Sequence, residues 1–314
     1  MDCFARMRGL MTFPREKLTF VTDSLRELEL RRLIMNALSE VTSDAGTVTR
    51  AQLSSLDIGF ETRRLIDQSR GIWNPRDLQA TLSVLSTPSG PYDDAALDGS
   101  VFRYDYRAGT TDGDNRKLRR AYELSLPIIL LRKVGAREFL PLFPVYVIAD
   151  RFEERHFLLG LDESLRSLSD PSNPTPTERR YISRLTQQRL HQPEFRAKVL
   201  LAYDTRCAVC LLKHGRLLDA AHIIGDREDR GDPVVTNGLT LCKIHHASYD
   251  SNMLGISPDY TVHVNRDLLE EVDGPMLKHG IQEMDKRPLT IPARRADQPD
   301  RERLATRYDE FLAS

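Results

Sequence analysis

Two pairs of metal-binding side chains constrain the fold of this chain more than any other feature. Cys207 and Cys210 stand in the segment CAVC, and Cys242 and His245 stand in CKIH. Each pair has two residues between its ligands and a loop separates the pairs, which is typical of a structural zinc site. Three thiolates and an imidazole suit Zn²⁺ and leave no position for a substrate. The alternative is a set of buried cysteines with a histidine nearby by chance.

Composition adds little to this beyond the expected compartment. Clustered cysteines in a reducing compartment bind metal more often than they form disulfides, and we expect Cys3 to be a free thiol. No segment approaches the roughly 18 apolar residues of a membrane span, and the N-terminus lacks a signal-peptide core. We therefore expect a cytoplasmic protein with no membrane partner. The formal net charge of -1 neither supports nor excludes nucleic acid.

The adjacent histidines His245 and His246 are expected to serve two different sites. Neighbouring side chains on a helix point about 100° apart, whereas residues three or four apart share a face. His246 and Asp250 are four residues apart, so a helix would place both on one face at the spacing of metal ligands. His245 would then turn toward Cys242, away from that face.

Three more elements lie in a fixed order around the second zinc pair. They are AHI, which contains His222, NGLTL, which begins with Asn237, and a helix that carries His246. Together with the zinc pairs, residues 203–254 resemble the HNH endonuclease family, and the chain is similar to bacterial restriction endonucleases of that family. The resemblance implies a ββα-metal fold, in which a β-hairpin and a helix surround one catalytic divalent metal and zinc braces the structure.

The resemblance also implies a role for each of these side chains. His222 would be the general base, since an imidazole accepts a proton near neutral pH. Asn237 would hold the loop and the base in position, and His246 with Asp250 would bind the catalytic ion, for which Mg²⁺ or Mn²⁺ suits an oxygen ligand better than a second zinc. The alternatives are a strand histidine, a turn asparagine and a solvated aspartate.

One position departs from the family pattern. Many members carry a metal-binding His or Asp directly before the general base, whereas this chain has Ala221. Asp219 shares a strand face with Ala221 and could supply the missing ligand; water or phosphate oxygens could also fill the place. If nothing compensates, the site is degenerate, and the protein is a zinc-braced DNA-binding protein without activity.

The order of predicted elements indicates an α+β protein with a nuclease domain at its C-terminal end. Leu and Ile recur at helical spacing over residues 22–39, with Thr22 or Asp23 as the N-cap, and a helix over 115–125 has Asp112 or Asp114 as its cap. LPIILLRKV and FLPLFPVYVIA read as two strands. We expect four parts: a helical or winged-helix-like module at 1–70, an α+β recognition domain at 71–166, a Pro-rich linker at 167–178, and the HNH nuclease domain with flanking helices at 179–314.

Target choice is expected to lie in the N-terminal region, because a small nuclease module reads little sequence. A reader of modified bases needs a basic face and an aromatic pocket for an extruded base. Trp73, Tyr104 and Tyr106 could form the pocket, with ordinary core packing as the alternative. The candidate DNA-binding cations are Arg103, Arg107, Arg116, Lys117, Arg119 and Arg120.

These observations together predict a metal-dependent endodeoxyribonuclease that hydrolyses DNA phosphodiester bonds in restriction or phage defence. Its cofactors would be structural Zn²⁺ and catalytic Mg²⁺ or Mn²⁺. Modified bases in the DNA partner and a homodimer that cuts both strands are further options that the residues leave open.

Overall fold

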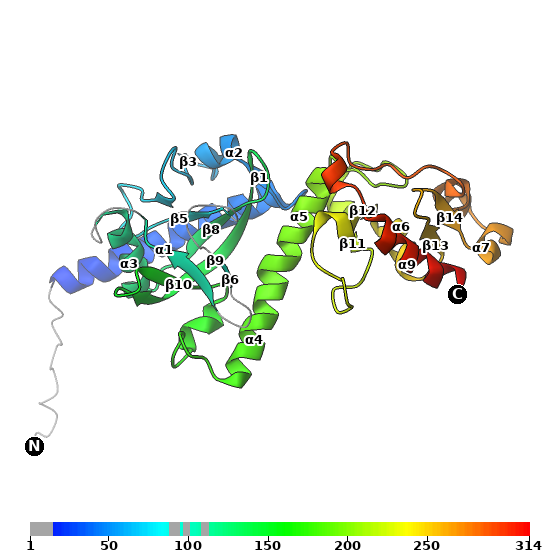
Figure 1. Ribbon diagram of the computed structural model, residues 1–314. Helices are drawn as coiled ribbons and strands as arrows, with labels where there is room; N and C mark the ends of the chain where they lie inside the picture. The colour runs from blue at the N-terminus through cyan, green and yellow to red at the C-terminus, as the bar shows by residue number, and fades with distance from the viewer. Residues whose placement is uncertain (1–14, 88–94, 97–100, 108–112) are drawn as a thin grey trace, which may run out of the picture.

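A computed structural model describes residues 15–87, 95–96, 101–107 and 113–314 (Figure 1). Two lobes lie on either side of a long helical segment, which carries the labels α4 and α5 in Figure 1. The N-terminal lobe is built on a mixed sheet, and the C-terminal lobe holds short hairpins and helices. The predicted α+β class is confirmed.

The sheet of the N-terminal lobe has the strand order β4-β5-β8-β9-β10-β7-β6, and β1 also pairs with β9. β5 and β8 pair in parallel, whereas the other neighbours pair antiparallel. The predicted strands LPIILLRKV and FLPLFPVYVIA form the hairpin β8–β9. The strand bounds are β1 Val48–Thr49, β4 Ile72–Trp73, β5 Ser83–Ser86, β6 Ala95–Ala96, β7 Phe102–Asp105, β8 Ile128–Lys133, β9 Glu138–Arg151 and β10 His156–Gly160.

Helix α1 (Arg15–Thr42) lies along this sheet rather than in a module of its own. It begins at Arg15, so Thr22 and Asp23 lie inside the helix and the predicted N-cap there is wrong. Ile34 and Leu38 share one core with Ile129 of β8. The buried side chains of residues 34–66 therefore share a core with the sheet, and the four predicted domain limits stay a proposal.

The short elements after α1 complete this lobe. They are α2 (Arg50–Ser54), β2 (Leu56–Asp57) and β3 (Thr62–Arg63), and Thr49 and Gln52 form a capping box at the start of α2. Helix α3 (Asp114–Glu123) follows β7 and buries Leu118 and Ala121. Asp114 is the first helical residue rather than the cap, and Asp112, the other predicted cap, lies outside the described residues.

The two lobes are joined by one continuous helical segment. After the 3₁₀ turn at Glu163–Ser167, helix α4 (Pro176–Thr186) begins with a capping box in which Thr175 and Glu178 bond each other. A π-helical turn at Gln187–His191 follows, and α5 (Gln192–Ala202) continues from it. The helix therefore begins two residues before the predicted end of the linker.

The C-terminal lobe contains a β-hairpin followed directly by a helix. Strands β11 (Leu218–His222) and β12 (Gly238–Cys242) pair antiparallel, with His222 opposite Gly238. Helix α6 (Lys243–Asp250) comes next, and its residue Tyr249 shares a core with Leu239 of β12, Leu304 and Val199 of α5. The remaining elements are β13 Leu254–Ile256, β14 Val262–Val264, α7 Arg266–Glu270, α8 Pro275–Gly280 and α9 Arg301–Leu312.

Among the residues that the structure describes, no helix combines the length and the apolar character that a membrane span needs.

Candidate metal centre and nuclease site

The two zinc pairs meet in one cluster. The potential ligand atoms of Cys207, Cys210, Cys242 and His245 all lie within 4.8 Å of one another. His245 Nδ1 is 3.2 Å from Cys242 Sγ and 3.5 Å from Cys207 Sγ, and the Sγ atoms of Cys210 and Cys242 are 3.9 Å apart. The hairpin and α6 carry Cys242 and His245, whereas the turn after α5 carries the first pair.

The surroundings of this cluster fit a zinc ion. His245 Nε2 is 2.8 Å from the carbonyl oxygen of Gly280, to which it can donate, and this leaves Nδ1 free to bind metal. Hydrogen bonds among the three thiols lower the pKa of Cys242 below its ordinary value and raise the pKa of Cys210 above it. The Cys₃His donor set matches a closed tetrahedral site with a structural role.

His222 ends strand β11 and stacks on the ring of Phe195 from α5. The ring centroids are 4.2 Å apart and the planes are inclined by 19°. Its Nε2 is buried and has no hydrogen-bond partner within the described part of the chain. Burial lowers the pKa of His222 below its ordinary value, and the negative charge of Asp226 opposes that shift. A buried polar atom without a partner is uncommon and marks this ring as a candidate for chemistry.

Asn237 closes the loop that follows His222. Its Nδ2 donates to the carbonyl oxygens of Ile224, at 3.0 Å, and Asp232, at 3.1 Å, and its Oδ1 accepts from Ile224 N at 3.0 Å. Its backbone carbonyl accepts from Ile223 N at 2.9 Å. The residue that makes these side-chain and backbone bonds is fully buried. The two residues directly after His222 are thereby fixed.

The glycine after Asn237 allows close packing of a neighbouring helix and is not required by a turn. Gly238 has a φ of -127°, which any residue adopts. A Cβ at this position would lie 2.5 Å from Val199 Cγ2 and 2.9 Å from Phe195 Cζ, so α5 can approach the hairpin closely only at a glycine. This contact holds the ring of Phe195 in place beside His222.

The ring of His246 lies between two carboxylates. Nδ1 is 3.5 Å from Asp219 Oδ2, and Nε2 is 3.4 Å from Asp250 Oδ2. Asp219 also accepts a short hydrogen bond from Lys243 Nζ and lies 3.9 Å from Arg196 Nε. Burial raises the pKa of Asp219, but Lys243 and His246 outweigh burial and leave it below its ordinary value.

These contacts change the role that we assign to Asp219. An ion held by Nε2 of His246 and by Asp250 would lie at the opposite edge of the ring from Asp219. The predicted compensation for Ala221 by Asp219 stays a prediction, and the contact with Nδ1 favours an orienting role for Asp219. A carboxylate on the second ring nitrogen instead orients a metal-binding histidine. Ala221 itself is fully buried and packs in the core of the lobe.

A pocket of about 390 Å³ connects His222 with the His246–Asp250 pair. Asp219 is not part of its wall. Four carboxylates and one arginine line it, a balance that suits a hydrated divalent cation. The lining residues are His222, Ile223, Ile224, Gly225, Asp226, Glu228, His246, Asp250, Arg307 and Glu310.

Arg307 and Phe195 are site residues that the sequence reasoning missed. Arg307 lies on the C-terminal helix α9, donates to the carbonyl oxygen of Tyr249 at 2.6 Å, and forms an ion pair with Glu310 at 3.3 Å. Its side chain is only 13% exposed. No motif spacing connects either residue with His222, because α5 and α9 reach the pocket through tertiary packing alone.

The predicted DNA-binding cations of the N-terminal lobe are mostly engaged within the protein. Arg103 pairs with Asp105, Arg119 with Asp150, and Arg120 with Glu123. Arg107 donates to the carbonyl of Leu85, and Lys117 donates to those of Pro75 and Leu78. Arg116 is exposed, and Arg116, Lys117, Arg119 and Arg120 line a pocket of about 640 Å³. Their contact with DNA stays a prediction.

The aromatic residues proposed for base stacking do not form an open pocket. Tyr104 and Tyr106 are buried in the core of the sheet, which was the alternative interpretation. Trp73 packs against the core around α1, and its Nε1 donates to the carbonyl oxygen of Arg64 at 2.6 Å. The three rings therefore contribute to packing, and an extruded base would have to bind elsewhere.

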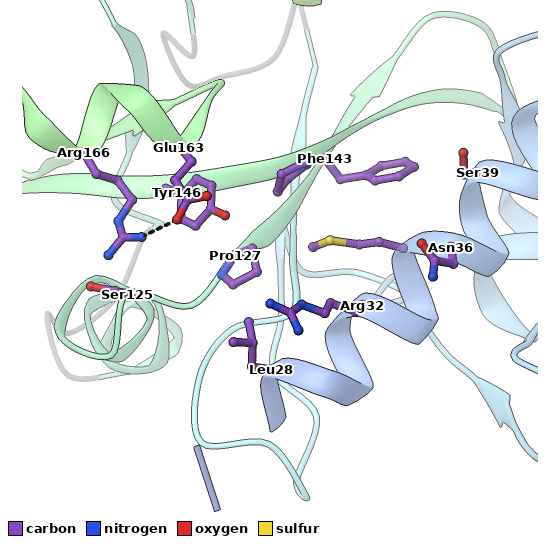
Figure 2. Close-up of a pocket in the computed structure, with 12 residues that line it drawn as sticks. Leu28, Arg32, Asn36, Ser39, Ser125, Pro127, Phe143, Tyr146, Glu163 and Arg166 are labelled. Atoms are coloured by element: carbon purple, nitrogen blue, oxygen red, sulfur yellow. Dashed lines mark hydrogen bonds and ion pairs between the residues drawn. The ribbon is translucent and has the colours of Figure 1, made fainter. Parts of the chain in front are cut away.

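A separate pocket of about 470 Å³ lies between α1 and β9 (Figure 2). Leu28, Arg32 and Asn36 of α1 face Phe143 and Tyr146 across it. Figure 2 also shows the ion pair between Arg166 and Glu163 at 2.9 Å on its rim. None of the residues that the sequence predicts for the site lies in this pocket.

Comparison with known proteins identifies the domain that carries the site. No curated protein matches the chain. A solved structure named "Modification dependent TagI restriction endonuclease" is 17% identical, with a TM-score of 0.31 over 83% of this chain and 90% of that chain. Residues 207–257 match the sequence model of the HNH endonuclease family. Residues 207–257 therefore form an HNH endonuclease domain, which contains the Cys₃His cluster, the hairpin β11–β12 and helix α6.

Proposed function

We propose that this protein is a metal-dependent endonuclease that hydrolyses DNA phosphodiester bonds with His222 as the general base. The observation that carries the proposal is the single pocket that His222, His246 and Asp250 line together, with Nε2 of His222 buried and unpartnered in the described structure. A nuclease needs a proton acceptor and a cation site within one small space, and this pocket offers both.

In this proposal, the chain's own residues prepare a water molecule and hold the phosphate. The ring of His222 takes a proton from water as the water oxygen bonds to phosphorus and the bond to the 3′-oxygen breaks; a second water protonates the leaving oxygen. Phe195 and Asn237 keep the ring and its loop in place. Arg307 offers a positive charge to a phosphate oxygen at the pocket wall.

The cation would be held by His246 and Asp250, with Mg²⁺ or Mn²⁺ as the ions that suit these ligands. When bound, such an ion supplies positive charge that stabilises the phosphoryl oxygens and the leaving group. His222, Asn237, His246 and Asp250 thus keep the roles that the resemblance implies, whereas Asp219 becomes a positioning residue.

We further propose a role in restriction or phage defence, with target choice by the N-terminal lobe and modified bases as one class of target. The sequence resemblance to bacterial HNH restriction endonucleases supports this role, as does a second folded lobe that the nuclease chemistry does not use. A homodimer that cuts both strands belongs to the same proposal, and light scattering of the purified protein would test it.

Substitution of His222 by Ala is the direct test. Zinc-loaded protein is incubated with Mg²⁺ or Mn²⁺ and with plasmid DNA, either modified or unmodified, and the wild type should cleave it. His222→Ala should reduce the cleavage rate by about 10²–10⁴-fold, because a general base contributes on that order. Cleavage is read on agarose gels as conversion of supercoiled DNA. Equal cleavage by the two proteins would contradict the assignment.

The alternative is a zinc-braced DNA-binding protein with a degenerate site. Ala221 favours it, because this buried methyl group occupies the position where many family members place a ligand. Under this alternative the wild type binds DNA but cuts none of the substrates with either metal. That result would replace the nuclease proposal.

A further inference from the structure

Three consecutive residues of α5 contact three different parts of the molecule. Glu194 bonds to the N-terminal sheet, Phe195 stacks on His222, and Arg196 bonds to the β11 strand. Successive helical side chains point about 100° apart. Three neighbouring residues can therefore contact three different parts of the molecule only where the helix is enclosed on several sides. Figure 1 shows α5 between the two lobes.

The helical segment is fixed to the N-terminal lobe by two ion pairs. Glu194 Oε2 is 3.1 Å from Arg132 Nε of β8, and both side chains are close to 10% exposed (12% for Arg132 and 10% for Glu194). Earlier in the segment, Arg189 bonds to Asp162 at 2.6 Å and to the carbonyl oxygen of Phe143 at 3.2 Å. Partly buried, hydrogen-bonded pairs of this kind have fixed geometry.

Arg196 extends this attachment into the nuclease domain. Its Nη2 donates to the carbonyl oxygens of Gly215, at 2.8 Å, and Leu218, at 2.9 Å, and its Nε lies 3.9 Å from Asp219 Oδ1. Asp219 is the carboxylate that lies against Nδ1 of His246. One guanidinium therefore holds the start of β11 and is adjacent to the carboxylate that orients His246.

The same guanidinium also contacts the loop after α1, residues 43–46. Nη1 of Arg196 donates to the carbonyl oxygen of Ala45 at 3.2 Å. The loop is closely packed there: Arg216 bonds to Ser43 Oγ at 2.7 Å and to Asp44 Oδ1 through its backbone nitrogen at 3.2 Å. A Cβ on Gly215 would lie 2.4 Å from the carbonyl oxygen of Asp44. The loop and the hairpin thus meet without space between them.

We propose that Arg196 is a positioning residue that couples the N-terminal lobe to the catalytic cation site. It fixes the start of β11, the strand that carries Asp219, while Lys243 bonds the Asp219 carboxylate beside His246. The contact of loop 43–46 with Arg196 and Gly215 fixes that arrangement. When the N-terminal lobe binds a target and displaces this loop, the position of the His246 ring changes. This inference rests on the proposed role of His246 as a metal ligand.

The first test compares Arg196→Met with the wild type as full-length, zinc-loaded protein. Titration with Mn²⁺, followed by electron paramagnetic resonance, measures the affinity of the cation site directly. We expect the affinity to fall about 10–100-fold, the usual effect when a group that orients a metal-binding histidine is lost. Arg196→Lys, which keeps the charge near Asp219, should recover part of this loss. Arg189→Gln, at the far attachment of the same helix, should change the affinity less than threefold.

The second test uses a pair of glycines and changes no charge. Gly215→Ala places a methyl group against Asp44 and must separate the loop from the hairpin, whereas Gly274→Ala meets nothing within 4 Å. We expect Gly215→Ala to weaken Mn²⁺ binding about tenfold and Gly274→Ala to leave it unchanged. Circular dichroism and zinc content show that each variant is folded.

The outcomes separate this inference from the proposed function. Absence of Mn²⁺ binding in the wild type, or binding that His246→Ala leaves intact, would overturn the proposed cation site itself. A second outcome is that His246→Ala loses Mn²⁺ binding whereas Arg196→Met and Gly215→Ala keep the wild-type affinity. That outcome would overturn only the coupling. Weaker binding in both folded variants, with both controls unaffected, supports it.

Discussion

At the scale of single residues, the site depends on side chains whose hydrogen-bonding capacity is used in different ways. The side-chain amide of Asn237 forms hydrogen bonds with the backbone of the loop after His222. His222 keeps a buried nitrogen without a partner in the described structure. The first arrangement gives rigidity, whereas the second leaves the position of the His222 ring to its stacking on Phe195 and to the loop after it.

Substitution of Asn237 by Asp tests the rigidity of the loop. An ionised carboxylate cannot donate, so it would face the carbonyl oxygens of Ile224 and Asp232 with no hydrogen bond. We expect a loss of about 2–4 kcal/mol in the free energy of unfolding and a large loss of nuclease activity. Urea titration measures the first and plasmid cleavage the second. The matched control is Asn173→Asp, at an exposed position where Oδ1 accepts a hydrogen bond from Arg179, and it should behave as the wild type. Equal stability of the two variants would contradict the role of the Asn237 amide.

At the scale of elements, the zinc cluster joins two segments that the hairpin alone would not hold together. The turn with Cys207 and Cys210 and the start of α6 with His245 contribute ligands to the same cluster. His246 is the next residue of α6, so the proposed cation site lies directly beside the Cys₃His cluster. Zinc binding releases free energy only in the folded state and therefore stabilises it.

Substitution of Cys207 by Ser should therefore reduce stability and activity together. We expect loss of bound zinc, a melting temperature lower by several degrees, and reduced cleavage, because the start of α6 is no longer held. Zinc content by atomic emission and thermal melting are the measurements. Lys213→Ser, an exposed change in the same loop, is the control. Full zinc content with unchanged melting in Cys207→Ser would refute the zinc assignment.

At the scale of the whole molecule, the chain contains separate hydrophobic cores on the two sides of α5. One core packs Phe195, Val199 and Leu304 around the hairpin, and another packs Ile34 and Leu38 of α1 against Ile129 of the sheet. A buried arginine on α1, Arg31, pairs with Glu27 and donates to the carbonyl oxygens of Ala80, Thr81 and Pro127. The stability of each lobe should respond mainly to changes in its own core.

Substitution of Arg31 by Met provides the test. Glu27 would remain buried without its counter-charge, and removing one partner of such a pair costs about 3–5 kcal/mol. We expect the N-terminal sheet to unfold at a lower urea concentration than in the wild type. The nuclease domain should lose its zinc at the same urea concentration as in the wild type. Arg32→Met, an exposed change on the same helix, should alter neither transition. A single transition that moves as a unit would show that the lobes unfold together.

Much of the nuclease domain was predictable because its chemistry is local in sequence. The spacings of the two zinc pairs, the AHI and NGLTL segments, and the interval between His246 and Asp250 fix ligand geometry over short stretches, and the cluster and the ββα arrangement agree with them. The apolar strands β8 and β9 were also evident. The start of α1 and the packing of residues 15–70 were not, because both depend on contacts with a sheet that is distant in sequence.

The sequence by itself determined which side chains of this protein can form a metal cluster, since residue type and spacing decide which ions a short segment can bind. Only the tertiary structure decided what surrounds those ligands. Phe195 on His222, Arg307 in the pocket and Arg196 beside Asp219 all come from helices with no motif spacing to the site. It also placed Asp219 and Asp250 at different edges of His246, because the two nitrogens of one imidazole ring point in different directions.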